Sequence, residues 1–389
     1  MRILVGLFVF NFVVVWSFDY TIWYNYRNRE FSGDIYKQIA KDRFGNFVVC
    51  PISLELILTL LYDGARGQTA AELDRTVYLP HYRSSVNPLI QTVLNDLNDQ
   101  PEDVSLNVAN KIYVTEDLKL SDDFANTAVN VFKSDIENID FRTPEVTIHK
   151  VNKWVSDQTH NYIRDLLAAG DVDSTTKSIL VNTLFFKAKW LKHFSERSWK
   201  SDFYINERQT VPVDMLDTTE DIMYHEDDEL RAKFIELPYN GDDLSMVIVL
   251  PERKYGLSHL EDNIRKVLHT ELHNTYSVRV TIPKFKIEST IKFVPILENL
   301  GITTLFTPSA NLDGIAGKNS GLYVNNVIQK SFIEVNENGT LAASASATNI
   351  VYLPHVPYPE REFIANHPFI YYIKSAVGIL FIGRFAGHE

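Results

Sequence analysis

Apolar residues recur along this chain in two rhythms, one typical of strands and one typical of helices. β-Branched and aromatic runs bounded by turn residues predict eight strands. These are Leu106 to Val114, Ser178 to Phe186, Phe234 to Leu237, Leu244 to Leu250, Ser277 to Ile282, Tyr323 to Val335, Phe369 to Ile373 and Gly378 to Phe385. Helical spacing predicts helices at Leu54 to Tyr62, Ala70 to Val77 and Val151 to Leu167. Because these elements mix without a strand–helix–strand rhythm, we expect an α+β domain with largely antiparallel sheets.

One segment fits neither rhythm. From Thr340 to Ser346 every residue except Leu341 is small. The stretch has no glycine after Gly339 and no proline before Pro354, the residues that usually punctuate connections. Small side chains at alternate positions can enter a sheet without needing a cavity. The segment is therefore either a surface linker or a strand that lies outside its sheet.

Length and composition favour one globular domain. The chain has 389 residues, yet no linker, repeat or charge run divides it, and 45% hydrophobic residues can fill a large core. Its formal net charge of −12 argues against nucleic acid and anionic membranes as partners.

The N-terminus is typical of a secretory signal, with Arg2 followed by a largely apolar run and small residues near position 17. We therefore expect residues 1–17 to be a signal peptide and residues 18–389 to be a single secreted, extracellular domain. No later segment offers a long uncharged apolar stretch. The one cysteine, Cys50, leaves the chain without an internal disulfide, and its apolar neighbours predict a buried, unreactive thiol.

A series of short motifs resembles the serpin family, and the resemblance covers nearly the whole mature chain. The motifs are Asn46 with Cys50-Pro51-Ile52-Ser53, Gly64 to Thr69, Ala109 to Tyr113, Val151 to Val155, Val181 to Trp190, Glu236 to Tyr239, Ser245-Met246, Leu250-Pro251, Ile282 to Phe285, Asn366 to Phe369 and Gly383-Arg384. The resemblance implies three β-sheets, eight or nine helices and an exposed reactive-centre loop at about residues 337–362. Among serpins the chain is most similar to secreted insect members such as accessory-gland proteins of seminal fluid.

The resemblance also implies a mechanism. A serpin is not an enzyme: a serine protease cuts its loop, forms a covalent acyl complex, and is carried along as the loop inserts into the central sheet, sheet A. The residues that match the family's hinge are Glu337, Gly339, Thr340, Leu341, Ala342, Ala343 and Ser344. Leu341 replaces the family's usual glutamate, and we expect it to point to solvent.

Four residues match the family's sheet-opening region. Ser53, Asn182 and Gln329 correspond to a polar cluster beneath the sheet, and Trp190 corresponds to a tryptophan at its top. Gln329 stands where the family has histidine. Glutamine can donate and accept hydrogen bonds but does not titrate near neutral pH.

The family's spacing from Gly339 places the residue before the cut at Leu353, with Pro354 after it. Proline after a scissile bond makes a poor substrate, so we expect cleavage between Tyr352 and Leu353 first and between Leu353 and Pro354 second. Residues 340–360 contain no Lys or Arg. A chymotrypsin-like or elastase-like target is therefore favoured over a trypsin-like one.

Other partners are limited. The triplet Asn338-Gly339-Thr340 is the only N-glycosylation acceptor and predicts a glycan at the base of the loop. No heparin-type site is evident, because residues 79–104 contain no Lys and Arg83 is their only Arg. We expect a monomer without cofactor or metal.

Two alternatives stay open. A non-inhibitory serpin that acts as a carrier or signalling protein is favoured by Pro354, Leu341, Gln329 and a glycan at Asn338, while the small hinge residues argue against it. An enzyme is the weaker alternative, because the sequence lacks the Gly-x-Ser-x-Gly elbow. His269 and His273 are four residues apart, as zinc ligands can be, but lack the accompanying glutamate; we interpret them as a solvated helix face.

Overall fold

The computed structural model describes residues 20–98, 104–195, 198–241, 243–340 and 359–387. Its helices are α1 (Tyr20–Asp42), α2 (Pro51–Gly64), α3 (Gly67–Val77), η1 (Arg83–Ser85), α4 (Val86–Asn98), α5 (Asp122–Asn130), α6 (Pro144–Gln158), α7 (Leu257–Asp262), α8 (Ile264–His269), α9 (Val294–Asn299), η2 (Thr304–Phe306) and α10 (Asp313–Ala316). Its strands are β1 (Phe47–Val49), β2 (Val104–Thr115), β3 (Asp135–Ile139), β4 (Ser178–Lys189), β5 (Trp199–Asn206), β6 (Gln209–Asp227), β7 (Ala232–Pro238), β8 (Ser245–Pro251), β9 (Thr275–Pro283), β10 (Phe285–Lys292), β11 (Asn326–Asn336), β12 (Gly339–Thr340), β13 (Arg361–Ile364), β14 (Phe369–Ser375) and β15 (Gly378–Phe385).

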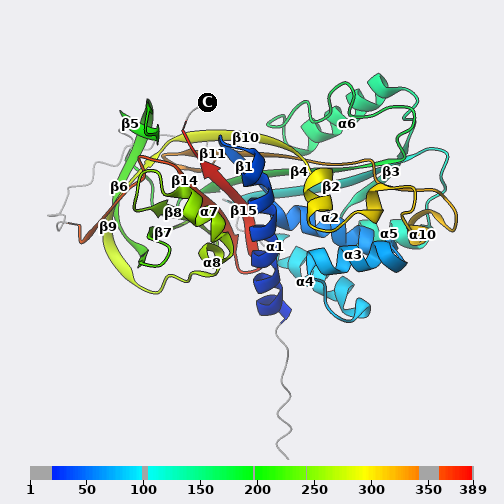
Figure 1. Ribbon diagram of the computed structural model, residues 1–389, viewed down its shortest axis with the longest axis horizontal. Helices are drawn as coiled ribbons and strands as arrows, with labels where there is room; N and C mark the ends of the chain where they lie inside the picture. Colours follow the sequence, from blue (N-terminus) through cyan, green and yellow to red (C-terminus); the bar gives the residue numbers. More distant parts are fainter. Residues whose placement is uncertain (1–19, 99–103, 196–197, 242, 341–358, 388–389) are drawn as a thin grey trace, which may run out of the picture.

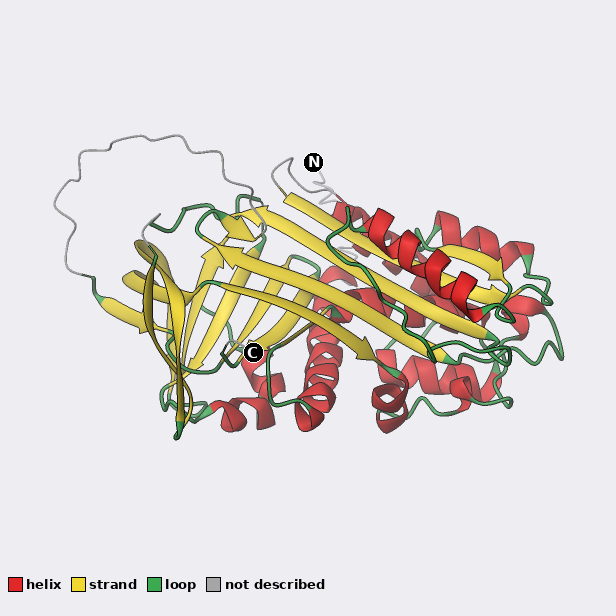
Figure 2. Ribbon diagram, turned by 90° about the horizontal axis from the view of Figure 1, so that it is seen from above, coloured by secondary structure: helices red, strands yellow, loops and turns green. Residues whose placement is uncertain are grey.

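The strands form two hydrogen-bonded sheets. One has nine strands in the order β1-β15-β14-β8-β7-β6-β9-β13, with β5 attached to β6, and the other has six in the order β10-β11-β12-β4-β2-β3. Figure 2 shows the six-stranded sheet running along the long axis of the molecule. Most pairings are antiparallel; the parallel ones are β4 with β11, β2 with β3 and β9 with β13. The α+β class with largely antiparallel sheets is thus confirmed.

The numbers of helices and β-sheets differ from those that the family resemblance implied, for simple structural reasons. The described part of the chain holds ten α-helices instead of eight or nine, because short helices such as the single-turn α10 are counted. Hydrogen bonding among the strands of the described ranges yields two sheets instead of three. The 19-residue strand β6 pairs with β5, β7 and β9 and so joins groups of strands that would otherwise be separate.

The six-stranded sheet is packed on both faces, with α6 on one side and α2 on the other (Figure 1). Successive residues of β4 point to opposite faces. Val181 and Phe185 pack in a small cluster with residues of α6, whereas Leu180 and Leu184 pack in the main core. Asn182 shares the face of Leu180 and Leu184, and therefore points toward α2.

The helix expected from Val151 to Leu167 begins earlier and ends earlier, since α6 spans Pro144–Gln158. The chain leaves the helix at His160 and Asn161, which have positive φ values of 49° and 66°. Leu167 is still buried in the cluster beneath α6. The apolar rhythm therefore continues past the helix end, which is why periodicity alone overextended it.

Helix α1 was not predicted, because polar residues occupy two of its buried positions, Asn28 and Ser32. The Asn28 amide donates to Glu55 Oε2 at 3.0 Å, and its Oδ1 accepts from the backbone N of Ile379 at 2.6 Å. Glu55 is 2% exposed, and burial raises the pKa of its carboxyl to about 8. These contacts tie α1, α2 and β15 together in the core. None of the helices in the described ranges is long and apolar enough to span a membrane.

Candidate functional site

The segment singled out by its small residues is anchored at both ends. Before it, β12 lies in the six-stranded sheet; after it, β13 pairs in parallel with β9, and the backbone N of Glu360 donates to Ser277 O at 2.9 Å. Residues 341–358 lie outside the described part of the chain. The predicted positions in that range are Leu341, Ala342, Ala343, Ser344, Tyr352, Leu353 and Pro354.

The first hinge residues already lie inside the sheet. Thr340 pairs with Val335 of β11 on one side and with Ala188 of β4 on the other. Its side chain is fully buried. In this structure, therefore, Gly339 and Thr340 already lie in the gap between β11 and β4.

Gly339 makes that entry sterically possible. Its φ is +149°, and a Cβ atom there would lie 2.1 Å from the carbonyl oxygen of Ala188. No other residue type fits so close an approach without moving β4.

An aromatic stack holds Thr340 in place. The Thr340 hydroxyl lies 2.8 Å from the hydroxyl of Tyr239. The Tyr239 ring stacks on Trp190 with centroids 4.4 Å apart, and Trp190 Nε1 donates to the Asn336 carbonyl at 3.0 Å. Burial raises the pKa of Tyr239 far above its ordinary value, so its hydroxyl stays protonated. Trp190 was predicted as a site residue and Tyr239 was not, although it ends the quoted motif Glu236 to Tyr239.

The turn that leads into β12 is also held. Glu337 forms an ion pair with Lys284, with oxygen–nitrogen distances of 3.0 and 2.9 Å. The Asn338 carbonyl accepts from the backbone N of Trp190 at 3.1 Å. Asn338 itself is partly exposed, so the glycosylation acceptor lies at the surface, while Thr340 of the same triplet is buried.

A polar cluster lies farther along the same two strands. The structure brings Ser53 of α2, Asn182 of β4 and Gln329 of β11 together, and all three are buried. Gln329 Nε2 donates to Asn182 Oδ1 at 2.6 Å, and Asn182 Nδ2 donates to Ser53 Oγ. Asn182 and Gln329 also face each other in the register of the parallel pair. The cluster therefore joins β4 to β11 through side chains as well as backbone.

The Gln329 amide is fully satisfied. Its Oε1 accepts from the backbone N of Cys50 at 2.8 Å and from Ser331 Oγ at 3.1 Å, and its Nε2 also donates to Cys50 O at 2.9 Å. Asn110 of β2 completes the group by accepting from Asn182 Nδ2. Cys50 contributes its backbone, and burial raises the pKa of its thiol, which confirms a buried, unreactive cysteine. Sequence reasoning missed Asn110 and Ser331, although Asn110 lies in a quoted motif.

The arrangement permits one specific rearrangement. Strands β4 and β11 pair in parallel from Asn326 to Phe332 and part only where β12 enters. Extending β12 would replace that single parallel ladder by two antiparallel ladders, which are more stable per residue. The hydrogen bond between Gln329 and Asn182 would have to break, because a new strand would lie between them.

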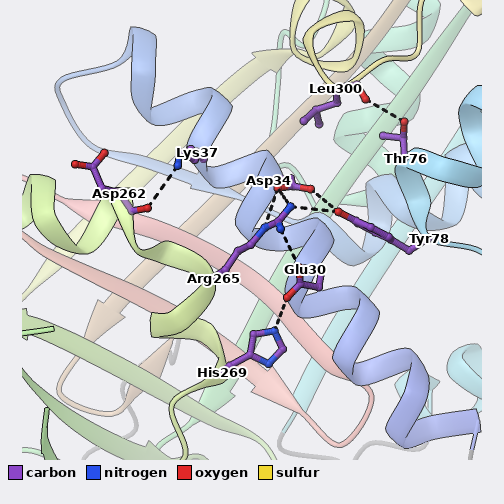
Figure 3. A network of polar contacts seen from close by, with 9 residues as sticks. All are labelled: Glu30, Asp34, Lys37, Thr76, Tyr78, Asp262, Arg265, His269 and Leu300. Atoms are coloured by element: carbon purple, nitrogen blue, oxygen red, sulfur yellow. Dashed lines mark hydrogen bonds and ion pairs between the residues drawn. The ribbon is translucent and has the colours of Figure 1, made fainter. Parts of the chain in front are cut away.

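The interpretation of His269 and His273 as one solvated helix face is wrong. Helix α8 ends at His269, so His273 lies beyond it. His269 Nε2 lies 2.8 Å from Glu30 Oε1, within a network between α1 and α8 shown in Figure 3. In the described residues, no group of three His, Cys, Asp or Glu side chains is arranged to hold a metal ion.

Comparisons with known proteins agree with one another. A family model described as serpin (serine protease inhibitor) matches residues 26–387. Alaserpin of Manduca sexta is 37% identical over 358 residues, which cover 89% of each chain. Antichymotrypsin-2 of Bombyx mori is 34% identical over 364 residues, covering 92% of this chain and 96% of that protein. The solved structure of Serpin48, a highly specific serpin of the insect Tenebrio molitor, aligns with a TM-score of 0.87 and 36% identity, covering 94% of this chain and 98% of that chain.

Proposed function

Because the chain belongs to the serpin family, we propose that it is a secreted inhibitor that traps an extracellular serine protease by loop cleavage and insertion. Serpins are not enzymes with catalytic turnover, and the family model and relatives such as antichymotrypsin-2 are named for protease inhibition. Beyond the family assignment, we propose that the protein is secreted, that it forms a covalent acyl complex with its target, and that the target belongs to a particular class of serine protease.

One observation carries the proposal: Gly339 and Thr340 already lie between β11 and β4. A strand from Thr340 to Leu353 would be roughly 46 Å long at about 3.3 Å per residue. At about 1 kcal/mol net for each added ladder hydrogen bond, its insertion would release on the order of 10 kcal/mol. The uncut protein is then held by a kinetic barrier, and β12 marks the point where insertion continues once the loop is cut.

The target is proposed from the chemistry of the loop. Residues 340–360 carry no Lys or Arg, and Tyr352 and Leu353 offer an aromatic and an aliphatic side chain to a specificity pocket. The relative antichymotrypsin-2 bears a name that fits the same class of protease. We therefore favour a chymotrypsin-like or elastase-like target, cut after Tyr352 or after Leu353.

The test uses the secreted protein with chymotrypsin, elastase and trypsin in parallel. The first two should give a complex that survives a denaturing gel, and mass spectrometry of the released peptide should identify the bond. The melting temperature of the cut protein should rise well above that of the uncut protein. Cleavage without a complex and without a gain in melting temperature would refute inhibition.

One observation favours a second candidate, a non-inhibitory carrier or signalling serpin. Three hydrogen bonds of Gln329 fix β11 to Asn182 of β4 and to Cys50 at the start of α2, so they oppose opening of the sheet. This candidate predicts that loop cleavage leaves the melting temperature unchanged.

We also propose that Asn338 carries a glycan. The residue is partly exposed in the turn before β12, where a bulky group could slow insertion. Mass spectrometry before and after glycan removal tests occupancy, and Asn338→Gln, which keeps the backbone contacts of the turn, tests the effect on inhibition. An unmodified Asn338 in the secreted protein refutes this part.

A further inference from the structure

A pocket of about 560 Å³ opens between the N-terminal half of α1, the end of α3 and the chain that leads into α4. Its volume lies in the range of small-molecule sites. The wall combines three aromatic rings with basic side chains: Trp23, Arg27, Arg75, Tyr78, His81 and Tyr82. It lies apart from the hinge and from the polar cluster between β4 and β11, so the proposed function does not use it.

Arg27 is the central basic group of this pocket. Its Cζ lies 5.3 Å from the ring centroid of Trp23 and 5.5 Å from that of Tyr78, within the range of cation–π contacts. Trp23 and Arg27 are four residues apart on α1 and so share a helix face. Within the part of the chain that the structure describes, no carboxylate pairs with Arg27. Two rings therefore hold the Arg27 guanidinium, and no residue in the described ranges accepts a hydrogen bond from it, so its donors can meet a ligand.

Tyr78 is fixed in position by contacts made outside the pocket. It ends α3 in the left-handed conformation, with φ 56°, which is uncommon for a residue with a side chain. Its hydroxyl donates to Asp34 at 2.9 Å and accepts from Arg265 at 3.2 Å, as Figure 3 shows. Burial, with Asp34 beside the hydroxyl, raises the pKa of Tyr78 to about 12, so this contact persists at physiological pH.

The opposite wall is also held. The Arg83 guanidinium lies 4.3 Å from the ring centroid of Tyr62, and it donates to the carbonyls of Asp63 at 2.7 Å and Ala65 at 3.1 Å. Arg83, the basic residue noted before α4, is thereby engaged in anchoring this segment to the end of α2. The pocket is thus built on fixed segments, which lowers the entropy cost of binding.

Charge decides the class of ligand. Two guanidinium groups, Arg27 and Arg75, and one carboxylate, Asp74, line the pocket wall, so Arg and Asp together leave one excess positive charge. The protein as a whole carries −12. We propose that this pocket binds a small aromatic anion, whose flat body stacks on Trp23 and Tyr78 and whose single carboxylate or sulfonate meets Arg27. A polyanion fits poorly, because only two guanidinium groups line the pocket and Asp74 lies beside them.

The test measures fluorescence binding of two matched probes to the secreted protein. Anilinonaphthalenesulfonate supplies the aromatic anion, and N-phenylnaphthylamine is its uncharged counterpart. Loss of a charged hydrogen bond costs about 1.5 to 3 kcal/mol, so Arg27→Gln should raise the Kd of the anionic probe about tenfold or more. The Kd of the neutral probe should change less than about twofold by the same reasoning. Trp23→Leu, which keeps the charge, should weaken both probes.

Arg29→Gln is the matched control, because Arg29 lies on the same helix but lines the neighbouring pockets. It should leave both Kd values unchanged. The proposal is overturned if the wild-type protein shows no saturable binding, if Arg27→Gln binds the anionic probe as tightly as wild type, or if Arg29→Gln is the variant that loses it. Melting temperatures close to that of wild type verify that the variants are folded. Protease inhibition is measured separately, so failure of the proposed function leaves this test intact.

Discussion

Replacing Thr340 by arginine tests the central inference about the hinge. Thr340 is fully buried, its hydroxyl contacts Tyr239, and it pairs with strands on both sides. An arginine there would have to stay buried without a partner, which costs several kcal/mol, or draw β12 out of the sheet. Expulsion loses only a few hydrogen bonds at about 1 kcal/mol each, or roughly 3 kcal/mol. We therefore expect the uncut variant to remain folded with its hinge displaced.

The consequence appears after cleavage. The cut loop has to begin its insertion at position 340, where the charged side chain is again unfavourable by roughly 3 kcal/mol or more. Because each 1.36 kcal/mol on a barrier is tenfold in rate, insertion should slow by about 100-fold or more. The acyl-enzyme would then hydrolyse before the protease is trapped. Thr340→Arg should therefore be cut as readily as wild type and yet release active protease.

The assay is a denaturing gel of each variant mixed with the protease that wild type traps, together with the residual protease activity. Thr340→Ser keeps the hydroxyl and should behave as wild type. Thr340→Val keeps the shape, loses the contact with Tyr239, and should retain most of the complex. A Thr340→Arg variant that forms as much covalent complex as wild type would refute the reasoning.

Three further predictions follow from other positions. Gly339→Ala should release β12 from the sheet, because the new Cβ would lie 2.1 Å from the Ala188 carbonyl oxygen. Limited proteolysis near the hinge should then become faster than in wild type. An unchanged rate of proteolysis would contradict the close approach of Gly339 to β4. Gln329→Ala leaves polar groups of Cys50 and Asn182 without partners. It should lower the free energy of unfolding, measured by urea denaturation, by about 2 to 4 kcal/mol. A change below about 1 kcal/mol would show that the cluster is not fully desolvated. The Glu55 carboxyl has a pKa raised to about 8 by burial, so it favours the folded state fully at pH below about 4.5 and loses that contribution as pH rises through about 8, roughly 5 kcal/mol in all. Glu55→Gln should remove this decline, seen as equal urea midpoints at pH 5 and pH 8, and a variant that keeps the slope of wild type would assign it to other groups.

Much of the fold was predictable because its strands carry their own signal. The runs at Ser178 to Phe186 and Gly378 to Phe385 became β4 and β15 with little change in bounds. Strand β6 was missed, since its pattern of buried and exposed residues is irregular over 19 residues. Helix α1 was missed because contacts far away in the sequence, such as that between Asn28 and Glu55, justify a polar residue in its buried face. A tertiary contact that satisfies a buried polar side chain cannot be recognised from the local pattern of apolar and polar residues.

The candidate site was predictable from motifs but not from physical pattern alone. Ser53, Asn182 and Gln329 come together as the family resemblance implied, yet they are separated by 129 and 147 positions. Tyr239 was missed because its role arises only where Thr340 lies against it, 101 positions away. The pocket beside Arg27 gave no sequence signal, because it needs the end of α3 to be placed beside α1.

The two anchors of the reactive segment set a limit of length. Twenty residues, 341–360, connect Thr340 in β12 to Arg361 in β13. A strand that grows from Thr340 consumes about 3.3 Å per residue, and the remainder must span the return path at no more than about 3.6 Å per residue. Even if the two anchors lay side by side, the strand could grow by only about eleven residues before the rest of the connection was fully extended. Complete insertion of residues 341–353 would require thirteen. The uncut connection between β12 and β13 is therefore too short for complete insertion while β13 stays paired with β9. Cutting the loop removes this limit.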